Sequence, residues 1–154
     1  MSGYSGTPLA HKLGIRTGTR LHVHAPPQHY TQLLAPLPPG VQLSARPGRK
    51  TDIIHIFAQR RAALAAALHR ALQAMRPDAV IWVSWPKKSS GVATDITEGV
   101  IREIALPLTL VDVKVCAVDE VWSGLKLVIR KSARAQAVPK RDAKVRGGRR
   151  AAPI

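Results

Sequence analysis

The segment 85–90, WPKKSS, combines residue types that could hold a phosphorylated ligand. A tryptophan ring stacks on a base, lysines attract phosphate, and serine hydroxyls together with the start of a following helix donate hydrogen bonds. The candidate ligand-binding residues are therefore Trp85, Lys87, Lys88, Ser89 and Ser90. The alternative is structural, with Trp85 in the core and both lysines solvated. In this alternative Pro86 shapes the exit of the strand; the sequence does not decide whether the Trp85-Pro86 bond is cis or trans.

The C-terminal segment 131–154 carries a dense series of basic residues, with Asp142 as its only acid. It has no aromatic residue and no sustained apolar period, so it is predicted to be a disordered tail. Basic side chains that reach phosphates release counterions, which predicts a salt-sensitive tether for RNA or DNA. The predicted nucleic-acid contacts are Lys131, Arg134, Lys140, Arg141, Lys144, Arg146, Arg149 and Arg150. The alternatives are a solubilising extension and contact with an anionic membrane surface.

Three histidines suggest a metal site. His22 and His24 share one face of a predicted strand, and His55 could face them from another strand if the two strands pair. Three imidazoles suit zinc, yet no Cys, Asp or Glu stands beside them at ligand spacing. We therefore predict packed or partly exposed histidines and no bound metal.

The other chemically active residues do not form a catalytic set. Asp119 and Glu120 are adjacent in a predicted turn, where both carboxylates are expected to be solvated and ionised, whereas an acid and base pair needs a cleft and unlike pKa values. Cys116 lies in a predicted strand without a charged neighbour and is expected to be a buried small residue. The sequence predicts no catalytic residue and no cofactor.

The elements that must position these groups follow from apolar runs and turn residues. The run AVIWVSW, which starts at Ala79, is typical of a strand buried on both faces at the centre of an α/β sheet. Ligands bind at the carboxyl ends of such strands. Further strands are predicted over 19–25, 41–45 and 52–57, and helices over 8–13, 28–35, 59–75 and 95–105.

The helix over 59–75 has the clearest pattern, since Leu64, Leu68, Leu72 and Met75 share one stripe. The strand over 41–45 is less regular. Only the segment 46–51 separates it from the next strand, whereas a parallel crossover takes roughly a dozen residues or more. It is therefore predicted to be antiparallel, at an edge, or not a strand.

Residues 110–118 and 121–130 predict an antiparallel hairpin that closes the sheet. The predicted fold class is thus α/β, with a three-layer, Rossmann-like, mostly parallel sheet that ends in an antiparallel hairpin. We predict one domain over residues 1–130 and the basic tail over 131–154.

Composition bounds the class of protein. The chain has 154 residues, 45% of them hydrophobic, which is enough for one core. Its single cysteine, the lack of a leader and the lack of a run of roughly 18 apolar residues predict a cytoplasmic protein. Twenty-four Lys and Arg against nine Asp and Glu give a net charge of +15, which favours an anionic partner.

Three segments resemble a family of small bacterial proteins, a domain of unknown function: GYSGTPL from Gly3, WPKKSSGVATDITE from Trp85, and ALPLTLVDVKVCAVDEVWSGLKLV from Ala105. The resemblance covers about residues 3–130 and implies no established activity. The order of elements is in turn similar to the later half of class I methyltransferase-like Rossmann domains.

That second resemblance implies an adenosylmethionine site, which the residues do not support. Such a site uses glycine after the first strand and an acidic residue farther on to hold the ribose. Here the first predicted strand ends in Ala25-Pro26-Pro27, and the second ends in Ala45-Arg46. Proline removes two amide donors from the turn.

These observations predict a non-enzymatic α/β domain that binds polyanions, RNA or DNA above all, through its tail. The main alternative is a protein or enzyme with a degenerate methyltransferase-like site for a nucleotide or another small phosphorylated ligand. A third hypothesis is an adaptor whose exposed hairpin edge pairs with another protein.

Overall fold

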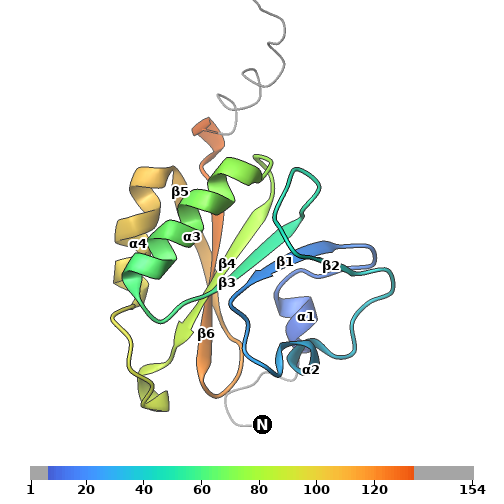
Figure 1. Ribbon diagram of the computed structural model, residues 1–154, viewed down its shortest axis with the longest axis horizontal. Helices are drawn as coiled ribbons and strands as arrows, with labels where there is room; N and C mark the ends of the chain where they lie inside the picture. Colours follow the sequence, from blue (N-terminus) through green and yellow to red (C-terminus); the bar gives the residue numbers. More distant parts are fainter. Residues whose placement is uncertain (1–6, 134–154) are drawn as a thin grey trace, which may run out of the picture.

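A six-stranded sheet forms the centre of the computed structural model, which describes residues 7–133 (Figure 1). The strand order is β2-β1-β3-β4-β6-β5. The first four strands in this order are mutually parallel, and β6 is antiparallel to both β4 and β5. Their bounds are β1 Arg20–His24, β2 Gln42–Ser44, β3 Ile53–Phe57, β4 Val80–Pro86, β5 Leu110–Ala117 and β6 Trp122–Ile129. The predicted fold class is confirmed.

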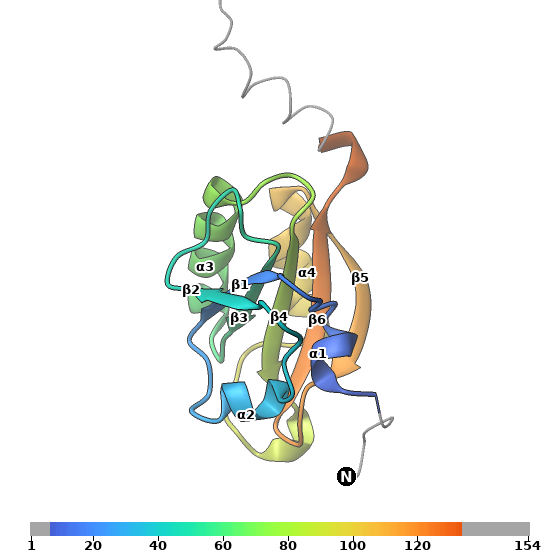
Figure 2. The same cartoon turned by 90° about the vertical axis from the view of Figure 1, so that its right-hand side faces the viewer.

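Helices cover the two faces of the sheet and complete three layers (Figures 1 and 2). The short helices α1 (Leu9–Lys12) and α2 (Tyr30–Leu34) pack on one face. The longer helices α3 (Arg61–Ala74) and α4 (Glu98–Ala105) pack on the other. Two 3₁₀ turns, η1 (Lys88–Ser90) and η2 (Leu106–Leu108), follow β4 and α4.

Strand β3 supplies both faces of the core because all five of its residues are buried. Alternate side chains of a strand point to opposite faces. Ile54 and Ile56 accordingly pack with α3 and α4, whereas Ile53 and Phe57 pack with α1 and α2. The predicted stripe of α3 lies on the sheet, where Leu64 and Leu68 are fully buried.

Strand β2 is a three-residue edge strand that pairs in parallel with β1. The expectation of an edge position is confirmed. The expectation that a short connection excludes a parallel direction is wrong. Strand β2 has only three residues, so the returning segment has little strand length to cover. A helix is therefore not needed in that connection.

Helix α4 begins later than predicted. Thr97 is its N-cap, and the Thr97 hydroxyl accepts a hydrogen bond from the Val100 N–H at 3.1 Å. Asp95, the predicted cap, instead accepts a hydrogen bond from the Arg61 N–H at 2.7 Å, at the start of α3. One carboxylate thus ties the beginning of α3 to the segment that precedes α4.

Asp119 organises the turn of the hairpin and is buried, which corrects the expectation that it is solvated. Its Oδ1 accepts hydrogen bonds from the Val121 and Trp122 N–H groups at 2.8 and 2.7 Å. Its Oδ2 lies 3.1 Å from His29 Nε2, just before α2. The carboxylate therefore shapes the turn and joins it to the opposite layer, while Glu120 is exposed.

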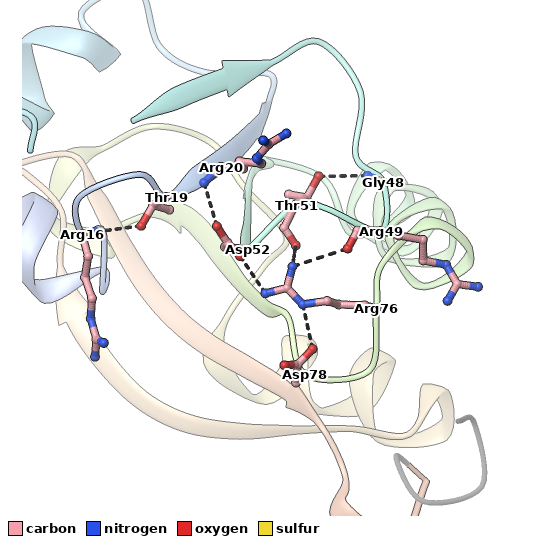
Figure 3. A network of polar contacts seen from close by, with 9 residues as sticks. All are labelled: Arg16, Thr19, Arg20, Gly48, Arg49, Thr51, Asp52, Arg76 and Asp78. Atoms are coloured by element: carbon pink, nitrogen blue, oxygen red, sulfur yellow. Dashed lines mark hydrogen bonds and ion pairs between the residues drawn. The ribbon is translucent and has the colours of Figure 1, made fainter. Parts of the chain in front are cut away.

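A polar network closes the amino ends of the parallel strands (Figure 3). The Asp52 carboxylate accepts hydrogen bonds from the Arg20 N–H at 2.8 Å and from Arg76 at 2.7 Å. Arg76 also donates to the Thr51 carbonyl at 3.1 Å and to Asp78 at 2.7 Å. Burial alone would raise the pKa of Asp52, but the Arg20 N–H and the Arg76 guanidinium together lower it.

Replacing Asp52 with alanine is expected to reduce the free energy of unfolding by about 1–2 kcal/mol, because both the Arg20 N–H and Arg76 lose an acceptor. Asp78→Ala is the matched control. Its side chain is 71% exposed against 38% for Asp52, so we expect a loss under about 0.5 kcal/mol. Urea unfolding of the two variants measures the difference. Equal losses would show that Asp52 is no more than another surface charge.

The structure also bears on two further expectations, which concern membrane-spanning segments and the isomer of the Trp85-Pro86 bond. None of the helices in residues 7–133 is long and apolar enough to cross a membrane. The single cis peptide bond of that range is Ala35-Pro36, so Trp85-Pro86 is trans.

Candidate functional site

The sheet has a topological switch point between β1 and β3. From β1 the chain passes through α2 to β2, which lies on one side of β1. From β3 it passes through α3 to β4, which lies on the other side. The two connections diverge at the carboxyl ends of β1 and β3, where open α/β sheets bind their ligands.

A cavity of about 410 Å³ opens at this point. Its lining comes from the ends of β1 and β3, the start of α3 and the first residue of β6, Trp122. Trp122 lies at the same edge of the sheet because it pairs with Pro86 at the end of β4. We call it the switch-point crevice. Its lining residues are His24, Ala25, Pro26, Pro27, Phe57, Ala58, Gln59, Arg60, Ala63 and Trp122.

The turn after β1 is unlike one that grips a cofactor through its amides. Ala25 has a φ of 54°, a left-handed conformation that usually requires glycine. Pro26 and Pro27 follow, and neither has an N–H to donate. The crevice lining also contains no carboxylate. The residues present therefore do not fit adenosylmethionine held by a glycine turn and an acidic residue.

Arg60 gives the lining of the crevice a positively charged side chain. Arg60 is exposed and is the residue just before α3. Within residues 7–133 no carboxylate forms an ion pair with it, whereas the neighbouring Arg61 pairs with Glu103 at 3.2 Å. The first amide of α3 is occupied by Asp95. An anion in the crevice would therefore meet the Arg60 guanidinium rather than the first N–H of the helix.

Aromatic rings form the inner wall of the crevice. Phe57 and Trp122 meet edge to face, with ring centroids 5.0 Å apart. The His55 ring stacks on Phe57 with centroids 4.4 Å apart. Trp122 is partly exposed and Phe57 is buried, so Trp122 presents the accessible aromatic surface.

A buried chain of hydrogen bonds supports this wall from beneath. His55 Nδ1 lies 2.8 Å from the Tyr30 hydroxyl, and His55 Nε2 lies 2.8 Å from the Ser84 hydroxyl. Burial lowers the pKa of His55 to about 3 and raises the pKa of Tyr30. His55 is therefore neutral at physiological pH, with both ring nitrogens satisfied. The side chains of Tyr30, His55 and Ser84 are buried, and their hydrogen bonds hold the His55 ring against Phe57.

The predicted ligand loop lies elsewhere. Trp85 is 7% exposed and packs in the core with residues of α3 and α4, so its ring is unavailable for stacking. Lys88 and Ser89 are exposed, while the Ser90 hydroxyl donates to the Lys87 carbonyl at 2.7 Å. None of them lines the switch-point crevice, in which Pro26 and Gln59 meet without Lys87.

The tail predicted over 131–154 overlaps the described range only at residues 131–133. Lys131 is exposed. The other predicted nucleic-acid contacts lie outside the described residues, and their role stays a prediction: Arg134, Lys140, Arg141, Lys144, Arg146, Arg149 and Arg150.

The three histidines do not converge. His22 and His24 share a face, but His55 pairs with Val23 and points to the opposite face, where it meets Tyr30. Residues 7–133 hold no group of three or more His, Cys, Asp or Glu that could bind a metal ion. Cys116 is partly buried, and burial raises the pKa of its thiol although Lys12 and Lys114 act in the opposite direction.

Phe57, Arg60 and Trp122 are the crevice residues that the sequence did not assign to a ligand. For Phe57 and Arg60 the signal was positional, because they lie at or just after the carboxyl end of the strand predicted over 52–57, whereas Trp122 lies at the start of the strand predicted over 121–130. Sequence alone did not show which strands are neighbours, so it did not bring Trp122 of the hairpin to the end of β3.

Comparisons with known proteins identify the fold. No family model and no curated protein matches the sequence. Solved structures similar to this chain include DhpI in a complex with SAH (TM-score 0.56, 13% identity, 80% of this chain and 83% of that one). A putative type 11 methyltransferase from Sulfolobus solfataricus has a TM-score of 0.53 at 11% identity over 80% of this chain and 90% of its own.

Fibrillarin from Aeropyrum pernix, with natively bound S-adenosyl-L-methionine, has a TM-score of 0.51 at 12% identity and covers 82% of this chain and 70% of its own. The chain therefore has a class I methyltransferase-like Rossmann fold, as the order of its elements predicted. The primary prediction of a non-enzymatic nucleic-acid-binding domain is contradicted, because the matched fold is one of methyltransferases. The alternative, a small-molecule site of degenerate methyltransferase type, fits better.

Proposed function

We propose that this methyltransferase-like protein binds a nucleoside phosphate in the switch-point crevice. The observation that supports this most is the composition of the crevice: it lies at the topological switch point and combines an aromatic wall, an arginine without a carboxylate partner in residues 7–133, and no acidic lining residue. Its volume of about 410 Å³ falls in the range of small-molecule sites, roughly 300–1,000 Å³.

The wall and the charge suit two parts of such a ligand. A base would lie against the exposed surface of Trp122 and the apolar Pro26-Pro27 turn, since an aromatic face stacks on any base. The phosphate would meet Arg60, whose guanidinium has the planar geometry for two hydrogen bonds to phosphate oxygens. His24 adds an imidazole to the lining.

The same composition disfavours adenosylmethionine. Its sulfonium group is positive and would lie in a crevice whose charged lining residue, Arg60, is also positive. The ribose would find no carboxylate acceptor, and the turn after β1 lacks the two amides that Pro26 and Pro27 remove. The positive charge of Arg60 would repel the sulfonium group but would attract the phosphate of a nucleotide.

Arg60→Gln tests the assignment, with Arg61→Gln as its matched control. Both changes remove one positive charge from adjacent residues, but only Arg60 lines the crevice. In a titration of the full chain with adenosine monophosphate, Arg60→Gln should weaken binding about tenfold or more, because a charge-assisted hydrogen bond contributes about 1.5–3 kcal/mol. Arg61→Gln should bind within about twofold of the parent, because its exposed ion pair contributes little.

Adenosine separates the base from the phosphate. It should bind the parent chain and Arg60→Gln with similar affinity, since it has no group for the guanidinium. Equal losses of adenosine monophosphate binding in both arginine variants, or tighter binding of adenosylmethionine than of the nucleotide, would overturn the proposal.

A further inference from the structure

Two of the six strands, β1 and β2, have no helix over them on the α3 face of the sheet. Helices α3 and α4 pack over β3, β4, β6 and β5, and no residue of β1 or β2 belongs to the core cluster they form. In Figure 1 the strands β1 and β2 extend to one side of α3 without a covering helix on the viewer's side. The shortness of the β2–β3 connection explains this, because it contains no helix.

A second cavity, of about 560 Å³, occupies this place beside α3. Its floor is formed by alternate residues of β1 and β3, and its walls by α3 and by the loop after β2. Apolar side chains line the floor, among them Ile54 and Ile56. The charged and imidazole groups are His22, His24, Arg46 and Arg70. We call it the cationic cavity.

No carboxylate balances these groups. None of the lining residues of the cationic cavity is acidic, and within residues 7–133 neither Arg46 nor Arg70 forms an ion pair. Three of the described arginines do form ion pairs, namely Arg61, Arg76 and Arg102. Burial, followed by the charges of Arg70 and His22, lowers the pKa of His24, which is the direction expected beside uncompensated positive charge.

We propose that the cationic cavity is a second ligand site, for a small organic phosphate with an apolar body. The phosphate would lie between Arg46 on the loop after β2 and Arg70 on α3, and the apolar part would lie against the accessible apolar lining residues Ala45, Pro47 and Ala74. Both guanidinium groups could donate hydrogen bonds to the phosphate, and the apolar lining distinguishes an organic phosphate from inorganic phosphate.

The cationic cavity adjoins the switch-point crevice but is distinct from it. His24 lines both, and Ala63 of the crevice is one helical turn from Ala67 of the cavity on α3. Two ligands would therefore lie side by side along α3, with His24 between them. The site does not depend on what the crevice binds.

Phenyl phosphate is the probe, with phenol as its neutral counterpart and inorganic phosphate as the anion without a body. The Arg46→Gln/Arg70→Gln double variant should weaken phenyl phosphate binding by the full chain at least tenfold, measured by calorimetry at constant ionic strength. Arg16→Gln/Arg130→Gln is the charge-matched control, because both arginines are exposed and neither lines the cavity. It should bind within about twofold of the parent, and both phenol and inorganic phosphate should bind more weakly than phenyl phosphate.

Arg60→Gln separates this site from the crevice. It should leave phenyl phosphate affinity within about twofold, and the Arg46→Gln/Arg70→Gln variant should retain whatever affinity the parent has for adenosine monophosphate. The proposal is overturned if phenyl phosphate does not bind at millimolar concentration, if the two double variants lose binding equally, or if Arg60→Gln abolishes it. Circular dichroism of each variant confirms that the comparison is made on folded protein.

Discussion

Replacing Trp82 with alanine is expected to reduce the free energy of unfolding by about 3–5 kcal/mol, the usual loss for a large aromatic residue in a core. Trp82 is fully buried in the layer between the sheet and α1. Its indole N–H donates to the Leu13 carbonyl at 3.0 Å. Gly124 on β6 lies against the ring, and a Cβ at that position would be 3.4 Å from Trp82 Cε3.

Urea unfolding with a fluorescence or circular-dichroism signal measures this loss. Val113→Ala is the control, because Val113 is 52% exposed on the edge strand β5 and should change stability by less than about 0.5 kcal/mol. Trp82→Phe should fall between them, as it keeps most of the ring volume but leaves the Leu13 carbonyl without its donor. A loss below about 1 kcal/mol for Trp82→Ala would contradict the position given to this ring in the core.

The second large effect is a dependence of stability on pH that comes from His55. In the folded protein burial lowers its pKa from 6.5 to about 3, so the unfolded chain takes up a proton that the folded chain does not. The stabilisation is fully present above about pH 6.5 and is lost as the pH falls toward 3. The slope is about 1.4 kcal/mol per pH unit.

His55→Gln removes this titration while keeping an amide that donates and accepts. Between about pH 5.5 and pH 4.5 the parent should lose about 1.4 kcal/mol more than His55→Gln does. This window lies above the range in which Asp52 takes up a proton, because the pKa of Asp52 is lowered from 3.8. Tyr30→Phe should start about 1–2 kcal/mol less stable yet keep the parent slope. Parallel pH profiles for the parent and His55→Gln would contradict the buried neutral imidazole.

Most of the fold was predictable because its signals are local. The stripe of α3, the apolar run of β4 and the turn between β5 and β6 each depend on residues close in sequence. The errors came from contacts between distant segments. Asp95 has the position of a helix cap for α4, but it bonds to Arg61 instead, and periodicity carries no information about that partner.

The candidate site was less predictable for the same reason. The sequence predicted a ligand at the end of the central strand β4, where Trp85 lies, whereas the switch point lies between β1 and β3, and β3 separates it from β4. Trp85 packs in the core, whereas Trp122 lines the crevice. The alternation of side chains along a strand decides which face of the sheet each tryptophan lies on. The register between β4 and β6 sets the position of Trp122 relative to the end of β4.

The tryptophan indoles provide the most direct test of nucleotide binding at the switch point. The chain has three tryptophans, so a nitrogen-15 correlation spectrum should show three indole N–H signals, assigned by Trp122→Phe and Trp85→Phe. On titration with adenosine monophosphate the largest shift should occur at Trp122, with Trp82 and Trp85 little changed. A spectrum in which no indole signal moves at millimolar nucleotide, or in which Trp85 moves most, would contradict the assignment of the ligand site to the switch-point crevice.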